Sequence, residues 1–247
     1  MIELATIKKK SVTDEVFEQL RARILDGGLP AGSALPAERS LCATLGVNRS
    51  AVREALKRLE QARLVSVRHG GGSRVLDYRE AAGLELLPHL LVTAGGTIDT
   101  DAVRSLLEMR SAIAPDIARL AADRAGHELD APLHRSVTAM RSAGGNLGEL
   151  QDLAAGFWQQ LVDGCGNLAY RLAYNSLRET YDRCRELLAE PMAEELRSAT
   201  GYASIADAVG ADRPDAAEAA ARELVRRGEH GIAAALRELD REQRATR

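Results

Sequence analysis

Apolar residues in the first quarter of the chain recur at helical spacing. The pattern predicts one helix over 11–27, a second over about 37–45 and a third that begins after Asn48 as its N-cap. Pro36 marks the entry to the second helix, and Gly46 ends it. The apolar positions that define the three helices are Val12, Val16, Phe17, Leu20, Ile24, Leu25, Leu41, Leu45, Val52, Leu56 and Leu59.

The pattern changes from helical to alternating after Leu64. Val65 and Val67 alternate with polar neighbours, the glycine-rich stretch 69–72 follows, and a second short apolar stretch returns at 74–76. This arrangement predicts a small β-hairpin. Two short helices joined by a turn and followed by a hairpin are typical of a winged helix-turn-helix, which we assign to residues 1–78.

The remaining residues, 79–247, show helical periodicity interrupted by glycine, proline or asparagine. We expect an all-α bundle of six or seven helices, so that the whole chain is mostly α. Pro115 lies inside the second of these helices, and we expect it to kink that helix. The predicted helices cover 79–94, 100–125, 128–143, 148–164, 168–189, 191–210 and 214–243.

Charge divides the chain in the same way. Residues 1–79 carry a net charge of +5, whereas residues 80–247 carry −8. A basic module joined to an acidic one favours nucleic-acid binding by the N-terminal part alone. Three unpatterned cysteines, the lack of a signal peptide and short apolar runs such as 84–92 favour a cytoplasmic protein with no membrane partner.

The start of the third predicted helix is the candidate DNA-reading element. In a helix-turn-helix the N-terminal part of the second helix of the motif enters the major groove. Arginine there can pair with guanine O6 and N7 through two hydrogen bonds, and Ser or Asn can bond phosphates or base edges. The alternative is a plain helical hairpin with solvated arginines. The residues that we expect to face the groove are Asn48, Arg49, Ser50, Ala51 and Arg53.

Three motifs in this region resemble a known family. LPAER at 35–39, GVNRSAVREALKRLE at 46–60 and VRHGGGSRV at 67–75 are similar to the winged helix-turn-helix of GntR-type bacterial transcription regulators. The resemblance departs at Arg63, where the family usually has glycine; either Arg63 adopts a left-handed conformation or the connection differs. The DNA contacts that it implies are Arg39, Asn48, Arg49, Ser50, Ala51, Arg53, His69 and Gly70.

The C-terminal part resembles the effector domain of the FadR subfamily of these regulators, through LLEMRSAIAPDIARLAA at 106–122 and FWQQLVDGCGN at 157–167. Many members hold a divalent metal there with one Asp and three His. The corresponding positions in this chain are Ala154, Trp158, Tyr202 and Leu224. Because alanine and leucine cannot donate an electron pair to a cation, we expect no metal and no other cofactor.

The stretches EAAGLELLPHLL at 80–91 and GCGNLAYRLAYNSLRETY at 164–181 resemble the branch of the subfamily typified by the acyl-CoA-responsive fatty-acid regulator FadR. The resemblance implies an effector pocket that takes long-chain acyl-CoA, formed by Trp158, Tyr202 and Leu224. Arg110 either anchors an acidic group or extends from a core helix toward water. RRGEHGIAAAL at 226–236 lacks the aromatic residue expected there.

No catalytic arrangement of side chains is evident in the C-terminal part, since its histidines are scattered and its paired acids fit solvated helix faces. We therefore expect a regulator, not an enzyme: a homodimer on a pseudo-palindromic operator, with residues 77–83 transmitting an effector signal. The alternatives are an inert pocket, a small organic acid as effector, and an effector-independent dimeric repressor.

Overall fold

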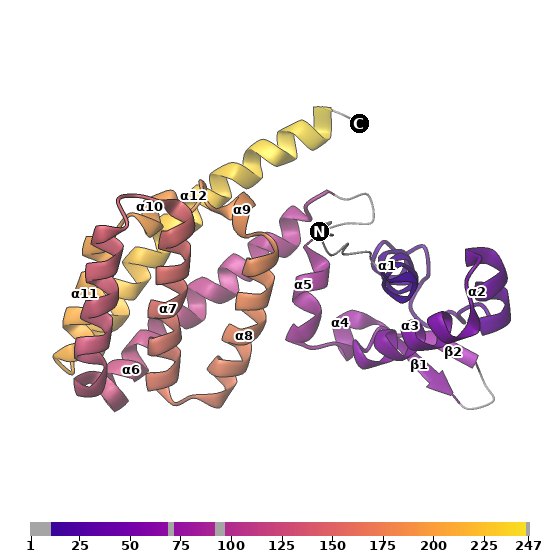
Figure 1. Cartoon of the computed structure of the whole chain (residues 1–247), viewed down its shortest axis with the longest axis horizontal. Helices are drawn as coiled ribbons and strands as arrows, with labels where there is room; N and C mark the ends of the chain where they lie inside the picture. Colours follow the sequence, from indigo (N-terminus) through magenta and orange to yellow (C-terminus); the bar gives the residue numbers. More distant parts are fainter. Residues whose placement is uncertain (1–10, 69–71, 92–96, 246–247) are drawn as a thin grey trace, which may run out of the picture. The chain divides into compact units, whose positions relative to one another are not determined.

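The computed structural model describes residues 11–68, 72–91 and 97–245. Contacts divide the chain into two compact units, one up to Ile98 and the other from Asp99 onward. Figure 1 shows the helices of each unit and the short hairpin of the first. The prediction of a mostly helical protein, with an N-terminal winged helix-turn-helix and an all-α C-terminal bundle, is confirmed.

The N-terminal unit begins with three helices at the positions that the apolar pattern indicates. Their bounds are Val12–Leu25 for α1, Glu38–Leu45 for α2 and Arg49–Gln61 for α3. Ser11 and Asp14 form a capping box at the start of α1, which satisfies two backbone donors there. Gly46 ends α2 with a φ of 65°, a conformation that glycine adopts without steric cost.

A two-stranded antiparallel sheet follows, formed by β1 (Val65–Arg68) and β2 (Gly72–Val75). The other side of β2 is partly covered, because the backbone N–H of Leu35 donates to the Ser73 carbonyl at 2.8 Å. The outer side of β1 receives a side chain instead, because the Val67 N–H donates to Glu60 Oε1 at 3.0 Å. The hairpin therefore has neighbours on both edges from its own unit.

The segment after the hairpin belongs to the N-terminal unit. It forms three short elements: α4 (Tyr78–Ala81), the 3-10 turn η1 (Leu84–Leu86) and α5 (Leu87–Leu90). Leu86 is only 2% exposed and packs in the same core as Phe17 and Leu59. The expectation of a single bundle helix over 79–94 is wrong, and the contacts divide the chain after Ile98 instead of after residue 78. An apolar pattern alone cannot show which core its residues enter.

The C-terminal unit is built around one long helix, α6 (Thr100–Ser142), against which α7, α11 and α12 all pack. The other helices of this unit are α7 (Leu147–Cys165), α8 (Leu168–Arg183), α9 (Arg185–Leu188), α10 (Ala193–Leu196), α11 (Ala199–Gly210) and α12 (Pro214–Ala245). In Figure 1, α6 and α12 run obliquely across the bundle behind α7. Across the described residues, no helix combines the length and apolarity needed to span a bilayer.

The breaks in these helices differ from the predicted ones. The predicted helices 100–125 and 128–143 are one element, with non-helical backbone at Ala125 (φ −145°) and not at Pro115. A side chain at the adjacent Gly126 would meet the Val209 carbonyl oxygen at 2.4 Å, so α6 closely approaches the end of α11 there. The predicted helices 168–189 and 191–210 are also each divided, the first of them at Cys184. Helix contacts of this kind are not visible in local sequence.

Candidate functional site

The start of α3 presents an exposed polar surface. Asn48 caps the helix, and its Oδ1 accepts hydrogen bonds from the Ala51 N–H and the Ser50 hydroxyl, both at 2.9 Å. The side chains of Arg49 and Arg53 are 69% and 60% exposed, one helical turn apart. These polar residues therefore project outward, as a groove-facing set must.

Ala51 does not belong to this exposed set. It is only 5% exposed and lies on the buried face of α3 with Val52, Ala55 and Leu56. The expectation that Ala51 faces the groove is wrong, because helical geometry places it on the same face as Ala55, four residues on. Its contribution at the helix start is the backbone N–H that Asn48 caps.

Helix α2 contributes two neighbouring side chains to the same surface. Arg39 is exposed and has no ion pair or hydrogen bond within the described residues. Glu38 accepts the Nε–H of Arg49 at 3.0 Å and the Nε–H of Arg53 at 2.9 Å, both on Oε2. The hydrogen bond from Arg49, and next that from Arg53, hold the pKa of Glu38 below its ordinary value. Sequence reasoning missed Glu38, although it lies within the LPAER motif.

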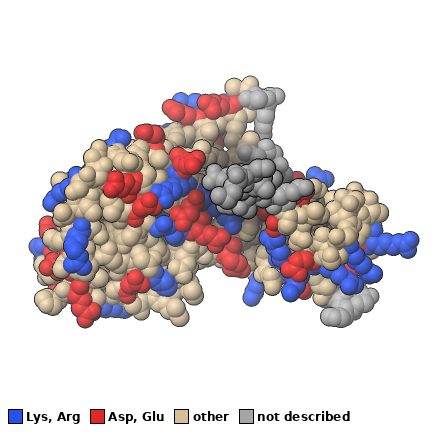
Figure 2. Space-filling model, viewed as in Figure 1, with Lys and Arg blue, Asp and Glu red and all other residues tan. Residues whose placement is uncertain are grey.

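Basic side chains also surround these residues. Figure 2 shows Lys and Arg predominating on the visible face of the N-terminal unit, whereas they alternate with acidic side chains on the C-terminal unit. Lys57 is exposed one turn beyond Arg53, and Arg74 of β2 donates to the Gly32 carbonyl at 2.8 Å. His69 and Gly70, the two predicted wing contacts, lie outside the described residues.

The four positions that correspond to metal ligands in the resembled subfamily come together in the C-terminal unit. Ala154 and Trp158 of α7, Tyr202 of α11 and Leu224 of α12 are all buried in one apolar core. The Phe157 ring packs edge-on against the Trp158 and Tyr202 rings, with centroids 6.5 and 5.1 Å apart. Within the described residues, no three His, Cys, Asp or Glu side chains are grouped so that they could hold a metal ion.

A partly buried ion pair lies beside this aromatic group, with the Arg110 side chain 22% exposed. Arg110 of α6 contacts both carboxylate oxygens of Glu195 in α10, with Nη1 to Oε2 at 3.0 Å. Glu195 is 1% exposed, and burial raises its pKa although Arg110 acts in the opposite direction. Burial acts to lower the pKa of Arg110, but the Glu195 carboxylate raises it overall. Of the two roles left open for Arg110, an anchor for an acidic ligand and an extension toward water, neither describes this contact: the guanidinium is neutralised by Glu195 of the protein itself.

Two buried polar atoms next to this pair have no hydrogen-bond partner among the described residues: Trp158 Nε1 and Tyr202 Oη. Burial raises the pKa of Tyr202 well above its ordinary value, and the Glu195 carboxylate adds to the effect. The Trp158 indole N–H acts in the opposite direction, so the two side chains are close, yet neither completes a hydrogen bond. Buried polar groups are nearly always paired, so these two side chains are the candidate polar contacts for a molecule bound in this cluster.

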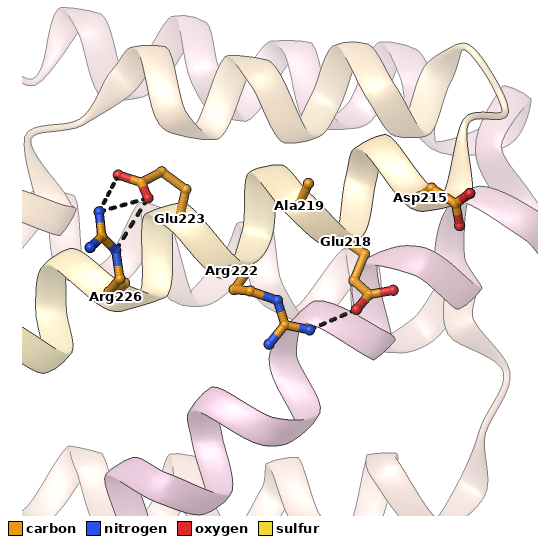
Figure 3. A pocket seen from close by; sticks show the side chains of 6 residues that line it. All are labelled: Asp215, Glu218, Ala219, Arg222, Glu223 and Arg226. Atoms are coloured by element: carbon orange, nitrogen blue, oxygen red, sulfur yellow. Dashed lines mark hydrogen bonds and ion pairs between the residues drawn. The ribbon is translucent and has the colours of Figure 1, made fainter.

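A surface hollow elsewhere on the unit is unrelated to this cluster. Figure 3 shows its lining side chains, all from α12, including Arg222 paired with Glu218 and Arg226 paired with Glu223. It shares no residue with the predicted effector-binding set, and four of its charged side chains pair with one another. It therefore offers nothing to the effector hypothesis.

Comparisons with known proteins identify both parts of the chain. Residues 12–75 match the model for bacterial regulatory proteins of the gntR family, and residues 105–227 match that for the FCD domain. The HTH-type transcriptional regulator Mce2R of Mycobacterium tuberculosis is 40% identical over 222 residues, which cover 90% of this chain and 92% of that protein. The chain belongs to the GntR family of bacterial transcription regulators.

Two further proteins extend the comparison. The fatty acid metabolism regulator protein of Edwardsiella ictaluri is 30% identical over 191 residues, covering 77% of this chain and 78% of that protein. A solved structure of Lar, described as controlling expression of the Listeria monocytogenes agr system, is 18% identical. It covers 91% of this chain and 99% of its own, with a TM-score of 0.52, and supports the fold alone.

Membership of the GntR family makes the chain a DNA-binding transcription regulator and not an enzyme. The gntR match contains the exposed set at the start of α3 together with Glu38 and Arg39. The FCD match contains Arg110, Trp158, Tyr202, Leu224 and Glu195. Each group of side chains described above therefore falls within the matched domain that bears on its predicted role.

Proposed function

We propose that this GntR-family protein is a homodimeric regulator of lipid or fatty-acid metabolism. Its affinity for operator DNA is modulated by a long-chain acyl-CoA. The main observation in support of this proposal is that Ala154, Trp158, Tyr202 and Leu224 share one apolar core. Where the metal-binding members of the subfamily offer nitrogen and oxygen ligands, this chain offers a hydrocarbon and aromatic lining. Such a lining favours an acyl chain over a small hydrophilic acid.

The polar groups beside that core support the same ligand class. A free carboxylate next to Arg110 would place a second anion on a cation that Glu195 already neutralises, in a setting of low dielectric constant. The carbonyl oxygen of a thioester is uncharged and accepts hydrogen bonds. Trp158 Nε1–H and Tyr202 Oη–H are donors without an acceptor, so they suit a carbonyl better than a carboxylate that needs a cation.

Relatives support the physiological setting. The protein from Edwardsiella ictaluri is named as a fatty acid metabolism regulator, and the shared region spans most of both chains. We infer that two copies of this chain place two α3 helices in successive major grooves of a pseudo-palindromic site. Arg39, Asn48, Arg49, Ser50 and Arg53 are the proposed contacts, with His69 and Gly70 in the wing. Residues 77–83, which lie within the N-terminal unit just after the hairpin, are proposed to receive the effector signal.

Release of DNA by defined ligands tests the proposal. The protein, bound to DNA from upstream of its own gene, is titrated with oleoyl-CoA, with free coenzyme A, with oleate and with small organic acids. We expect release by oleoyl-CoA only, and a rise in thermal stability with its concentration. Release by a small acid would support the rival effector class, and binding insensitive to every ligand would support an effector-independent repressor.

A hydroxyl deletion tests the site. Tyr202→Phe retains the ring and removes the unpaired hydroxyl, so we expect weaker oleoyl-CoA binding with unchanged DNA affinity. Tyr170→Phe is the matched control, because its hydroxyl is already used in a hydrogen bond to Asp116 at 2.9 Å. Equal ligand affinity in both variants would exclude Tyr202 from the site. Metal analysis of the purified protein completes the test, since a stoichiometric transition metal would contradict the proposal.

A further inference from the structure

The carboxylate of Glu38 lies among the basic side chains that are proposed to meet DNA. Its Oε2 accepts the Nε–H groups of both Arg49 and Arg53, which come from successive turns of α3. Glu38 itself comes from the first turn of α2, so the contact crosses the helix-turn-helix. One side chain thereby links both helices of the motif through two arginines.

An acid at this position is unfavourable for affinity alone. DNA binding is dominated by attraction to phosphates, and a carboxylate close to that surface repels them. Stability does not explain the residue either, because ion pairs between exposed side chains contribute little to folding. What the contact does supply is a fixed orientation for two long and otherwise mobile side chains.

The geometry determines which nitrogen atoms remain available. A guanidinium has one N–H on Nε and two on each terminal nitrogen. Glu38 engages Nε of both arginines, and within the described residues no hydrogen bond uses their Nη1 or Nη2 groups, which therefore remain available. Those terminal groups form the fork that pairs with O6 and N7 of guanine. Two arginines held one turn apart would present two such forks in a defined register.

We propose that Glu38 is a positioning residue that sets the sequence specificity of this protein by holding Arg49 and Arg53 through their Nε atoms. The inference depends on the proposed reading of DNA by α3. Glu38 touches the arginines and not the bases, and it lowers general affinity for DNA while raising the preference for guanine at the two positions that the arginines read.

Charge-matched variants test the proposal. Glu38→Gln removes one negative charge together with the strong acceptor. Glu54→Gln removes the same charge from an exposed position on α3 at which the described structure shows no ion pair or hydrogen bond. The probes are a duplex that the wild-type protein selects from a randomised library and the same duplex with each G·C pair replaced in turn by A·T. Thermal unfolding verifies that both variants are folded.

We expect Glu54→Gln to raise affinity for all duplexes equally and to leave the ratio of selected to altered duplex unchanged. Glu38→Gln should lower that ratio on the order of tenfold at the guanines that Arg49 and Arg53 read, and at no other position. In a background of Arg49→Ala and Arg53→Ala, Glu38→Gln should no longer change the ratio, since a positioning residue acts only through its partners.

Two different failures are distinguishable. If the wild-type protein selects no sequence, the reading of DNA by α3 is wrong, and the role of Glu38 is wrong with it. If the wild-type protein selects a sequence, but Glu38→Gln discriminates as well as Glu54→Gln does, only the positioning role is overturned. The positioning role is also overturned if Glu38→Gln lowers the ratio of selected to altered duplex as much in the Arg49→Ala and Arg53→Ala background as it does in the wild-type background.

Discussion

Arg63 joins α3 to the hairpin in a left-handed backbone conformation, with a φ of 53°. This settles the alternative left open by the sequence, in which Arg63 stands where the resembled family usually has glycine. A residue with a Cβ loses about 1 to 2 kcal/mol in this conformation relative to the right-handed one. The connection is therefore of the family's usual kind, and the arginine is tolerated there at some loss of stability.

Replacing this residue by glycine should stabilise the N-terminal unit. We expect Arg63→Gly to raise its free energy of unfolding by about 1 kcal/mol, because the steric cost of the positive φ disappears. Ala62→Gly is the control, since Ala62 has a φ of −77° and gains nothing from glycine. Hydrogen exchange of the α3 amides measures both variants. Equal destabilisation by both would show that Arg63 is not strained.

The Asp14 carboxylate gives the N-terminal unit a predictable acid sensitivity. The hydrogen bond from Arg58, and next those from Ser11, lower its pKa from the ordinary 3.8. The ionised form is thus favoured by folding, and its contribution is complete above about pH 4 and lost as the pH falls through the lowered pKa. Asp14→Asn should reduce stability at neutral pH and converge with the wild type in acid.

The control for this effect is Glu15→Gln, the same loss of charge at an exposed neighbouring site on α1. Hydrogen exchange of α1 amides as a function of pH distinguishes the two variants. A constant difference between Asp14→Asn and the wild type across the acid range would contradict the assigned cause. The single tryptophan cannot serve as the probe, because Trp158 belongs to the C-terminal unit.

At this scale the sequence indicates which side chains are polar and exposed, but not which of them meet. Arg49 and Arg53 follow from helical spacing, and the structure exposes both. The sequence-based assignment of Ala51 to the exposed face is wrong because the buried face of α3 also includes Ala51 and Ala55. Glu38 was not identified, and the expectation that the paired acids lie on solvated helix faces is wrong for Glu195, which is 1% exposed. Glu38 meets Arg53 across a turn and Glu195 meets Arg110 across 85 residues, and local periodicity carries no such information.

Among the helical elements, two glycines inside long helices have opposite roles. Gly126 in α6 faces the Val209 carbonyl oxygen, which a Cβ would approach to 2.4 Å, whereas a Cβ at Gly156 in α7 would meet nothing within 4 Å. The first is required by the close approach of α6 and α11. The second only weakens its helix, because glycine is a poor helix former.

Alanine should therefore act with opposite sign at these positions. We expect Gly126→Ala to destabilise the C-terminal unit by about 1 to 3 kcal/mol through overpacking against a backbone atom. Gly156→Ala should stabilise it by about 0.5 to 1 kcal/mol. Urea unfolding followed by Trp158 fluorescence measures both. A loss of stability at both positions would indicate that the space beside α7 is needed.

The division of α6 illustrates what could be foreseen about elements. The helical character of the C-terminal unit, and breaks near 144–146 and 166–167, follow from apolar spacing and from glycine and asparagine, whereas the number of helices does not. The position of the interruption does not: Pro115 continues the helix, and the backbone departs from helical geometry at Ala125. The departure coincides with a contact to α11, which no property of residues 100–142 encodes by itself.

For the whole molecule, the chief difference from expectation is that residues 79–91 pack with the N-terminal unit and not with the C-terminal bundle. Leu86 is fully buried in the N-terminal core, while the nearby Leu84 is 37% exposed. We expect Leu86→Ala to destabilise the N-terminal unit by about 2 to 5 kcal/mol and to leave the C-terminal unit unchanged. Leu84→Ala should have little effect on either unit.

Hydrogen exchange of α1 and α3, compared with that of α6 and α7, separates the two units in this experiment. Slow exchange retained in α1 and α3 of Leu86→Ala would contradict the packing described for that side chain. If Leu86→Ala instead lost hydrogen-exchange protection in α6, residues 79–91 would pack with the C-terminal unit, as the apolar pattern predicts.

The hydrogen bond from the Val67 N–H to Glu60 Oε1 has a consequence beyond a single molecule. An unpaired N–H on an outer strand is a template to which another strand can add, and Val67 offers an exposed apolar side chain at the same place. Glu60 occupies that donor and brings a negative charge to the edge. A protein carrying Glu60→Ala should retain its fold yet aggregate in a concentration-dependent way, through strand addition at the wing.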